Sequence, residues 1–209
     1  MSRKIIFATG NEDKLNEIKM ILEDMQIDGE PVEIYSMKEA GIQADICEDG
    51  TTFRENALIK VKAVAKKAPD AIVLADDSGL VIDALNGEPG IYSARYMGEK
   101  TSYHIKNRNL IERLKDVPWE QRTGRFVCAV AAALPDGQLL TWEGIMEGLI
   151  DYEEKGENGF GYDPIFFLPE YQMTSGQLTE EQKNAISHRG KALQLMKTEL
   201  NRIFCNLNK

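Results

Sequence analysis

Two acidic clusters are the first residues of this sequence whose types and spacing point to chemistry. Asp76 and Asp77 follow an apolar run at 71–75. The second cluster lies earlier, on a polar stretch, and consists of Asp45, Glu48 and Asp49. Adjacent residues of a strand point to opposite faces, so at least one carboxylate of the pair must face a polar site. Carboxylates without histidine suit a hard cation such as Mg²⁺, which keeps several waters and bridges to substrate phosphates. A solvated acidic turn is the alternative interpretation of each cluster.

The N-terminal segment offers a place for phosphate. Thr9, Gly10 and Asn11 come between an expected strand and an expected helix, and Lys14 lies one turn into that helix. A helix N-terminus presents backbone N–H groups, and a lysine beside it adds a positive charge, so an anion is the natural ligand. The segment lacks the spacing of a P-loop, and ordinary helix capping by Asn11 is the alternative.

A glycine-rich aromatic segment follows much later in the chain. Phe160 lies between Gly159 and Gly161, and Tyr162 and Asp163 come next. Glycines on both sides free the Phe160 ring to lie flat against a partner, and a nucleobase is a suitable one. The alternative is a turn whose aromatic side chains cover the core.

Positive charge gathers in a third segment of this acidic chain. Lys183, His188 and Arg189 lie within 183–190, beside an expected helix start at Ser187. Taken singly, His188 could be a structural histidine and Arg189 the partner of a surface ion pair.

Alternating strand and helix patterns position these residues. We expect strands at 4–9, 32–35, 71–75, 80–85, 125–134 and 138–142, with the Asp76–Asp77 pair at the C-terminal end of the third. We expect helices after Asn11, from Thr52 to Pro69, at 102–114, after Thr179 and around 192–203. In the second helix Lys60, Lys66 and Lys67 fall outside the apolar face. The pattern predicts an α/β fold, a mixed twisted sheet flanked by helices, with two lobes around a central substrate cleft and a single domain over 1–209.

Composition excludes several classes of protein. The chain has 209 residues and a formal charge of -9, from 34 acidic and 25 basic side chains. This charge repels a polyphosphate backbone, so we expect no nucleic-acid polymer as partner. Two histidines and three widely separated cysteines argue against a zinc site and against a disulfide scaffold. The apolar run near the N-terminus is too short for a membrane span or a signal-peptide core, so we expect a cytoplasmic protein with no membrane contact.

Six motifs in order resemble the inosine triphosphate pyrophosphatase family, also called XTP/dITP diphosphatases. They are T-G-N-x-x-K at 9–14, E-x-G-x-T-F-x-E-N-A at 48–57, A-D-D-S-G-L at 75–80, P-G-I-Y-S-A-R-Y at 89–96, G-F-G-Y-D-P-I-F at 159–166 and K-x-A-I-S-H-R-G at 183–190. The resemblance covers nearly the whole chain. It implies Mg²⁺-dependent hydrolysis of the α–β phosphoanhydride of ITP, dITP and XTP to a nucleoside monophosphate and pyrophosphate, which would cleanse the nucleotide pool.

The resemblance also implies roles for individual residues. Asp77 would be the general base or a metal-linked carboxylate, and Glu48 a metal ligand with it. The triphosphate would be held by Thr9, Gly10, Asn11, Lys14, Ser78 and Lys183. The base would be held by Phe160, Gly161, Tyr162, Asp163, His188 and Arg189, with Phe160 stacking and the last two addressing the 6-keto edge of the purine. A homodimer is implied as well.

Two other functions remain as alternative hypotheses. One is a pyrophosphatase that prefers modified pyrimidine nucleotides, and a substrate panel would distinguish it. The other is a non-catalytic nucleotide-binding regulator, against which the presence of both Asp77 and Glu48 argues.

Overall fold

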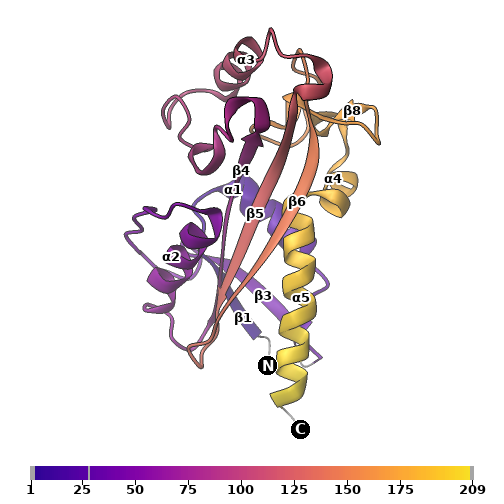
Figure 1. Ribbon diagram of the computed structural model, residues 1–209. Coiled ribbons are helices and arrows are strands. Elements are labelled where there is room, and N and C mark those ends of the chain that lie inside the picture. The colour runs from indigo at the N-terminus through magenta and orange to yellow at the C-terminus, as the bar shows by residue number, and fades with distance from the viewer. Residues whose placement is uncertain (1–2, 28, 208–209) are drawn as a thin grey trace. The chain divides into compact units, whose positions relative to one another are not determined.

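The computed structural model describes residues 3–27 and 29–207 (Figure 1). Its helices are α1 (Glu12–Ile21), α2 (Phe53–Ala65), α3 (Tyr103–Arg113), α4 (Glu180–Ile186) and α5 (His188–Leu207). Its strands are β1 (Arg3–Phe7), β2 (Gln26–Ile27), β3 (Glu30–Ser36), β4 (Ile72–Ile82), β5 (Thr123–Ala133), β6 (Leu139–Ile150), β7 (Phe166–Leu168) and β8 (Met173–Thr174). β1 pairs parallel with β3 and β4, whereas β7 pairs antiparallel with β6 and β8, so the sheet is mixed. The predicted α/β fold with a mixed sheet and flanking helices is confirmed.

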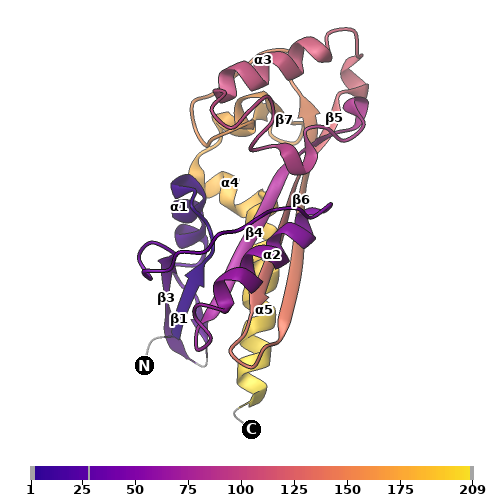
Figure 2. The same cartoon turned by 90° about the vertical axis from the view of Figure 1, so that its left-hand side faces the viewer.

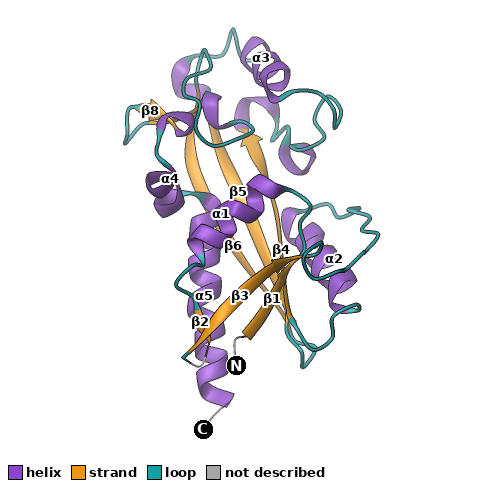
Figure 3. Ribbon diagram, turned by 180° about the vertical axis from the view of Figure 1, so that it is seen from behind, coloured by secondary structure: helices purple, strands orange, loops and turns teal. Residues whose placement is uncertain are grey.

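The chain divides into two compact units, which are described separately. Unit 1 comprises residues 1–77, 128–144 and 189–209, and unit 2 comprises residues 78–127 and 145–188. The strand order is β2-β3-β1-β4-β5-β6 in unit 1 and β4-β5-β6-β7-β8 in unit 2, because β4, β5 and β6 contribute residues to both units. β4, β5 and β6 are the long orange arrows of Figure 3. The single domain over 1–209 stays a prediction.

Unit 1 is a sheet covered by helices on both faces. Alternate residues of each strand face opposite helices, as the strand period of two requires. On β1, Ile5 and Phe7 belong to the core cluster that contains α1 and α5, whereas Ile6 packs in the cluster that contains α2. The same alternation is seen on β4, where Leu74 faces α1 and α5 and Val73 faces α2. Figures 1 and 2 show α2 and α5 on opposite sides of these strands.

Unit 2 has its own core. Leu110 and Leu114, at the C-terminal end of α3, pack with Leu80 and Ile82 of β4 and with Phe166 of β7. One fully buried cation, Arg122, lies beside this core and donates hydrogen bonds to three backbone carbonyls.

Three strand predictions are wrong in extent. We expected separate strands at 71–75 and 80–85, but β4 is one strand of 11 residues that runs through Asp76–Asp77–Ser78–Gly79. The D-S-G composition is typical of a turn, but the segment continues the strand, and burial of both aspartates overrides the local preference. β6, expected at 138–142, extends to Ile150.

The predicted helix starts are largely confirmed. Asn11, Thr52 and Thr179 each cap a helix by accepting a hydrogen bond from the backbone N–H three residues later. The expected start at Ser187 is displaced by one residue, since Ser187 ends α4 and α5 begins at His188. Within the described ranges, no helix is long and apolar enough to cross a membrane.

Candidate functional site

The Asp76–Asp77 pair lies inside β4, and its two carboxylates point to opposite faces of the sheet. Both side chains are buried. Asp77 contacts α2, whereas Asp76 contacts α1 and α5. The strand period therefore separates the pair into two sites that use different partners, as the sequence predicted.

Asp77 sits in a polar cluster with Lys60 of α2 and Glu48 of the preceding loop. The Lys60 Nζ lies 3.0 Å from Asp77 Oδ1, 3.1 Å from Glu48 Oε2 and 3.0 Å from the carbonyl oxygen of Asp76. Asn56, one helical turn before Lys60, donates from Nδ2 to Asp77 Oδ2 at 3.2 Å. The same amide accepts from the N–H of Gly50 at 2.9 Å, which fixes the acidic loop against α2. One helix face thus brings the two predicted carboxylates to a single ammonium group.

Charge and burial compete at this cluster. Burial raises the pKa of Asp77 above its usual range and outweighs the opposing effect of Lys60. Burial by itself would lower the pKa of Lys60, but Asp77, Asp76 and Glu48 together raise it. Asp77 is therefore a more basic carboxylate than an exposed aspartate, and Lys60 is a firmly protonated cation.

Lys60 is a residue of this cluster that the sequence pattern did not predict, because its position falls outside the apolar face of the helix, as do those of Lys66 and Lys67. The other two lysines are exposed, but Lys60 is only 8% exposed. The signal that could have found it is the spacing of four residues between Asn56 and Lys60, which puts both on the same helix face.

The donor set of this cluster fits a divalent metal in part. No group of three or more metal-ligating side chains occurs among residues 3–27 and 29–207. Glu48 and Asp77 nevertheless converge on one cationic group, the ammonium of Lys60. Two carboxylates are the usual protein contribution to a Mg²⁺ site that completes its coordination with water and substrate phosphate. The other two acids of the predicted cluster, Asp45 and Asp49, are exposed.

Asp76 organises a second, deeper ionic network. Its Oδ2 accepts from Lys14 Nζ at 3.1 Å and from Arg189 Nη2 at 3.1 Å. Arg189, only 1% exposed, also donates from Nη1 to Glu17. Burial would raise the pKa of Asp76, yet Lys14 and Arg189 hold it well below its usual range. Burial would lower the pKa of Arg189, and Asp76 and Glu17 raise it instead.

The N-terminal segment is shaped by its own side chains. Asn11 Oδ1 accepts from the N–H of Lys14 at 3.0 Å and caps α1. The N–H of Asn11 donates to Thr9 Oγ1 at 3.1 Å. Gly10 is exposed, and a Cβ added there would meet nothing within 4 Å. The backbone at this helix N-terminus is therefore open to a ligand.

The aromatic segment in unit 2 is held by Asp163. Gly159 and Gly161 have φ values of +72° and +71°, which place Phe160 on a loop that only glycine-rich sequences form readily. Asp163 Oδ2 accepts from the N–H of Phe160 at 2.9 Å and from Lys183 Nζ at 2.8 Å. The same ammonium lies 4.8 Å from the centroid of the Phe160 ring. The tertiary structure thus gathers Asp163, Lys183 and Phe160 into one cluster.

Two other predicted residues of unit 2 are also engaged. The His188 ring stacks on Phe126 with centroids 4.9 Å apart and an interplanar angle of 13°. The Tyr162 hydroxyl donates to the carbonyl of Ser93 at 2.7 Å.

The predicted site residues fall into both units. Unit 1 contains Thr9, Gly10, Asn11, Lys14, Glu48, Asp77 and Arg189. Unit 2 contains Ser78, Phe160, Gly161, Tyr162, Asp163, Lys183 and His188. Within unit 1, Glu48 and Asp77 share one lysine, while Lys14 and Arg189 share Asp76. The roles assigned to these residues stay predictions.

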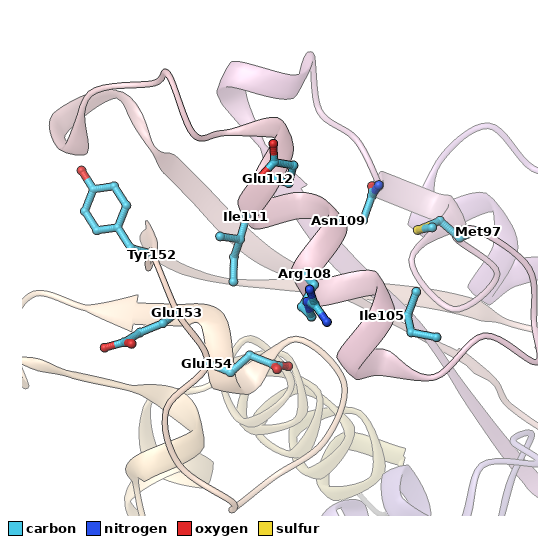
Figure 4. A pocket seen from close by; sticks show the side chains of 9 residues that line it. All are labelled: Met97, Ile105, Arg108, Asn109, Ile111, Glu112, Tyr152, Glu153 and Glu154. Carbon is cyan, nitrogen blue, oxygen red and sulfur yellow. The ribbon is translucent and has the colours of Figure 1, made fainter.

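A groove of about 700 Å³ lies elsewhere in unit 2 (Figure 4). Its walls include Ile105, Arg108 and Glu112 of α3, together with Tyr152 and Glu154 from the loop after β6. No predicted site residue lines it.

A model of the Ham1 family matches residues 5–199. The chain belongs to the Ham1 family. Among curated Ham1 relatives, a Clostridium perfringens protein named dITP/XTP pyrophosphatase is 45% identical over 203 residues, covering 95% of this chain and 97% of that protein. A Leuconostoc mesenteroides protein of the same name is 46% identical over 194 residues, covering 91% and 93%.

Solved structures of Ham1 relatives agree with the fold. The Staphylococcus aureus Ham1 protein has a TM-score of 0.82 and 41% identity, covering 95% of this chain and 98% of that one. A nucleoside-triphosphatase or dITP/XTP pyrophosphatase from Mycobacterium abscessus has a TM-score of 0.72 and 38% identity, covering 92% and 98%. The family resemblance predicted from the six motifs is confirmed.

Proposed function

We propose that this Ham1 protein is a Mg²⁺-dependent pyrophosphatase that hydrolyses ITP, dITP and XTP to a nucleoside monophosphate and pyrophosphate. The observation that carries the proposal is the buried Asp77 carboxylate, which shares the Lys60 ammonium with Glu48. Relatives over most of the chain are named dITP/XTP pyrophosphatase, which supports the same reaction class.

Asp77 is the proposed general base. Its carboxylate takes a proton from water as the water oxygen bonds to a phosphorus of the α–β bridge, and the bond from that phosphorus to the bridging oxygen breaks. Pyrophosphate and the nucleoside monophosphate separate on either side of the broken bond. Burial raises the pKa of Asp77, which makes the carboxylate a better proton acceptor than an exposed aspartate.

Glu48 and Asp77 would hold the Mg²⁺ ion. When bound, the ion would neutralise phosphate charge and acidify water. Lys60 and Lys14 add fixed positive charge to the same unit, where partial burial strengthens their attraction for phosphate oxygens. Thr9, Gly10 and Asn11 offer the helix N-terminus to the triphosphate, with Ser78 and Lys183 as further proposed contacts.

Base selectivity is assigned to the second predicted set. Phe160 stacks on the purine, and Gly161, Tyr162 and Asp163 shape the segment around it. His188 and Arg189 address the 6-keto oxygen. A donor aimed at this oxygen would face the 6-amino group of adenine and lose its acceptor, which costs about 1–3 kcal/mol per buried group. ATP is therefore expected to be a poor substrate.

Three further calls belong to the same proposal. The protein acts as a homodimer, works in the cytoplasm and uses residues 1–209 as one pyrophosphatase domain. Sedimentation at micromolar concentration tests the dimer: a mass near 47 kDa supports it and the monomer mass of 23.5 kDa opposes it.

The direct test is a substrate panel. Purified protein is incubated with Mg²⁺ and ITP, dITP, XTP, ATP, GTP or modified pyrimidine triphosphates, and pyrophosphate and orthophosphate are measured separately. We expect pyrophosphate, released fastest from ITP, dITP and XTP. Release of orthophosphate, preference for a pyrimidine, or tight ITP binding without turnover would each refute the proposal.

The variant Asp77→Asn tests the role of the carboxylate. It keeps the size of the side chain and removes the base, so kcat should fall by about 10²–10⁴-fold while ITP still binds. Asp70→Asn is the matched control, because Asp70 is exposed just before β4. An Asp77→Asn variant with more than half of the wild-type kcat would exclude Asp77 as the base.

A further inference from the structure

One buried amide in unit 1 joins the strand and the loop that carry the two proposed metal ligands. The Asn56 side chain lies on α2 and is fully buried. Its Nδ2 donates to Asp77 Oδ2 at 3.2 Å, and its Oδ1 accepts from the N–H of Gly50 at 2.9 Å. Both ends of the amide are therefore used, and turning it over would break both hydrogen bonds.

Gly50 packs directly against this amide. A Cβ added to Gly50 would lie 2.7 Å from Asn56 Oδ1 and 2.8 Å from the Cβ of Glu55, so any larger residue would push the loop away from α2. Glu48 lies two residues earlier on the same loop, and its Oε2 lies 3.1 Å from Lys60 Nζ. The position of the Glu48 carboxylate therefore depends on the contact between Gly50 and Asn56.

The carboxylate of Asp77 has a different donor at each oxygen. Lys60 Nζ lies 3.0 Å from Oδ1, and Asn56 donates to Oδ2. A carboxylate held at one oxygen can still turn about its bond to Cβ, whereas donors at both oxygens fix its plane. Each oxygen has a second lone pair, so the fixed plane also sets the direction in which the remaining lone pairs point.

The ammonium of Lys60 does not fix these directions by itself. It is a compact charge on a flexible side chain, and its donors rotate. Its contacts with Glu48 and Asp77 offset the repulsion between the two carboxylates but impose little direction on them. The planar Asn56 amide supplies the direction that the ammonium lacks.

We propose that Asn56 is a positioning residue that places Glu48 and Asp77 for binding a divalent cation. This inference rests on the proposed function, in which the two carboxylates hold Mg²⁺. Mg²⁺ demands near-ideal octahedral geometry, so a change in the separation or the plane of two carboxylates weakens its binding. Replacing a hydrogen-bond partner of a metal ligand lowers metal affinity by about 10–100-fold.

The test measures Mn²⁺ binding in the absence of nucleotide, by the electron paramagnetic resonance signal of the free ion. Mn²⁺ takes the same oxygen ligands as Mg²⁺. Asn56→Leu keeps the approximate shape of the side chain and removes both hydrogen bonds. The Kd for Mn²⁺ should therefore rise by about 10–100-fold. An unchanged Kd in Asn56→Leu would overturn the proposal.

Asn107→Leu is the matched control for the loss of a buried amide. Asn107 is also buried within a helix, α3 of unit 2, and its Nδ2 donates to Glu154 and to the carbonyl of Gly161. No carboxylate proposed to hold the metal contacts it, so Asn107→Leu should keep the wild-type Kd for Mn²⁺. Equal increases in the Kd of both variants would show a merely structural effect and would contradict the positioning role.

Gly50→Ala disturbs the same contact from the loop. Gly50 is not among the glycines with positive φ, so alanine strains only the packing against α2. Gly50→Ala should also weaken Mn²⁺ binding, and the double variant should bind no more weakly than Asn56→Leu does. Fully multiplying losses would contradict the proposal. Should Asn56→Leu fail to fold by circular dichroism, Gly50→Ala decides the question in the same assay, with an unchanged Kd as the refuting result.

Hydrogen exchange and turnover together distinguish this inference from the proposed function. Exchange of the Gly50 amide, followed by NMR, should be slow in wild type and faster in Asn56→Leu, which has no acceptor for that N–H. If exchange and Mn²⁺ affinity change as expected but wild type releases no pyrophosphate from ITP, the proposed function fails and the positioning stands. If wild type hydrolyses ITP but the two proteins bind Mn²⁺ equally, the proposed function stands and the positioning by Asn56 is refuted.

Discussion

Arg122 of unit 2 offers the sharpest stability prediction. Its side chain is fully buried, and its guanidinium lies 4.4 Å from the centroid of the Tyr152 ring. The three acceptors of its N–H groups are the carbonyl oxygens of Leu114, Ile150 and Asp151, at 2.6, 2.6 and 2.8 Å. One side chain therefore ties together the end of α3 and the end of β6. We predict that Arg122→Met strongly destabilises the protein.

The magnitude follows from those contacts. A buried carbonyl that loses its donor costs about 1–3 kcal/mol. Three such losses would sum to about 3–9 kcal/mol, but burial of the cation itself is costly and methionine fills part of the space, which reduces the total. We expect Arg122→Met to lower the free energy of unfolding by about 3–5 kcal/mol, at the level found when one partner of a buried ionic contact is removed.

The assay is urea denaturation at pH 7, followed by far-UV circular dichroism. The matched control is Arg125→Met, three residues later on β5. Arg125 pairs with Asp83 and Glu147, and all three side chains are partly or largely exposed. Its loss should therefore cost no more than about 1 kcal/mol. Equal effects of the two variants, or a loss below about 1 kcal/mol for Arg122→Met, would refute the reasoning from buried carbonyls.

Two further predictions concern the backbone and pH. Gly156 has a φ of +86°, and an added Cβ would overlap a neighbouring backbone carbonyl, so Gly156→Ala should lower the free energy of unfolding by about 2–4 kcal/mol. The control Gly137→Ala has a similar φ of +87° but open space around the added Cβ, so it should lower the free energy of unfolding by only about 1 kcal/mol. Equal urea midpoints for the two variants would contradict this prediction. Hydrogen bonds from the Ser36 backbone and Lys19 lower the pKa of Glu39 to about 2. A carboxylate with a lowered pKa stabilises the fold above its unfolded pKa of about 4.3. The difference in free energy of unfolding between wild type and Glu39→Gln, measured by urea titration, should therefore be full at pH 6 and shrink as the pH falls from 4.5 toward 2. A difference that grows on acidification would contradict this prediction.

The sequence by itself determined much of the local structure and the chemical theme. Asn11, Thr52 and Thr179 cap the helices expected to follow them, because capping depends on residues only three apart. The opposite orientation of Asp76 and Asp77 follows from the strand period alone. The order of six motifs, from Thr9 to Gly190, was enough to indicate the family.

Tertiary structure decided which charged groups meet. Lys60 and the exposed Lys62 are both lysines of α2, and only the approach of β4 and the acidic loop makes Lys60 the shared partner of Asp77 and Glu48. Glu17 is likewise 172 residues from Arg189 in the chain. β4 runs through a sequence typical of a turn because burial of Asp76 and Asp77 outweighs local preference. Such contacts depend on how distant elements pack, and no local spacing encodes them.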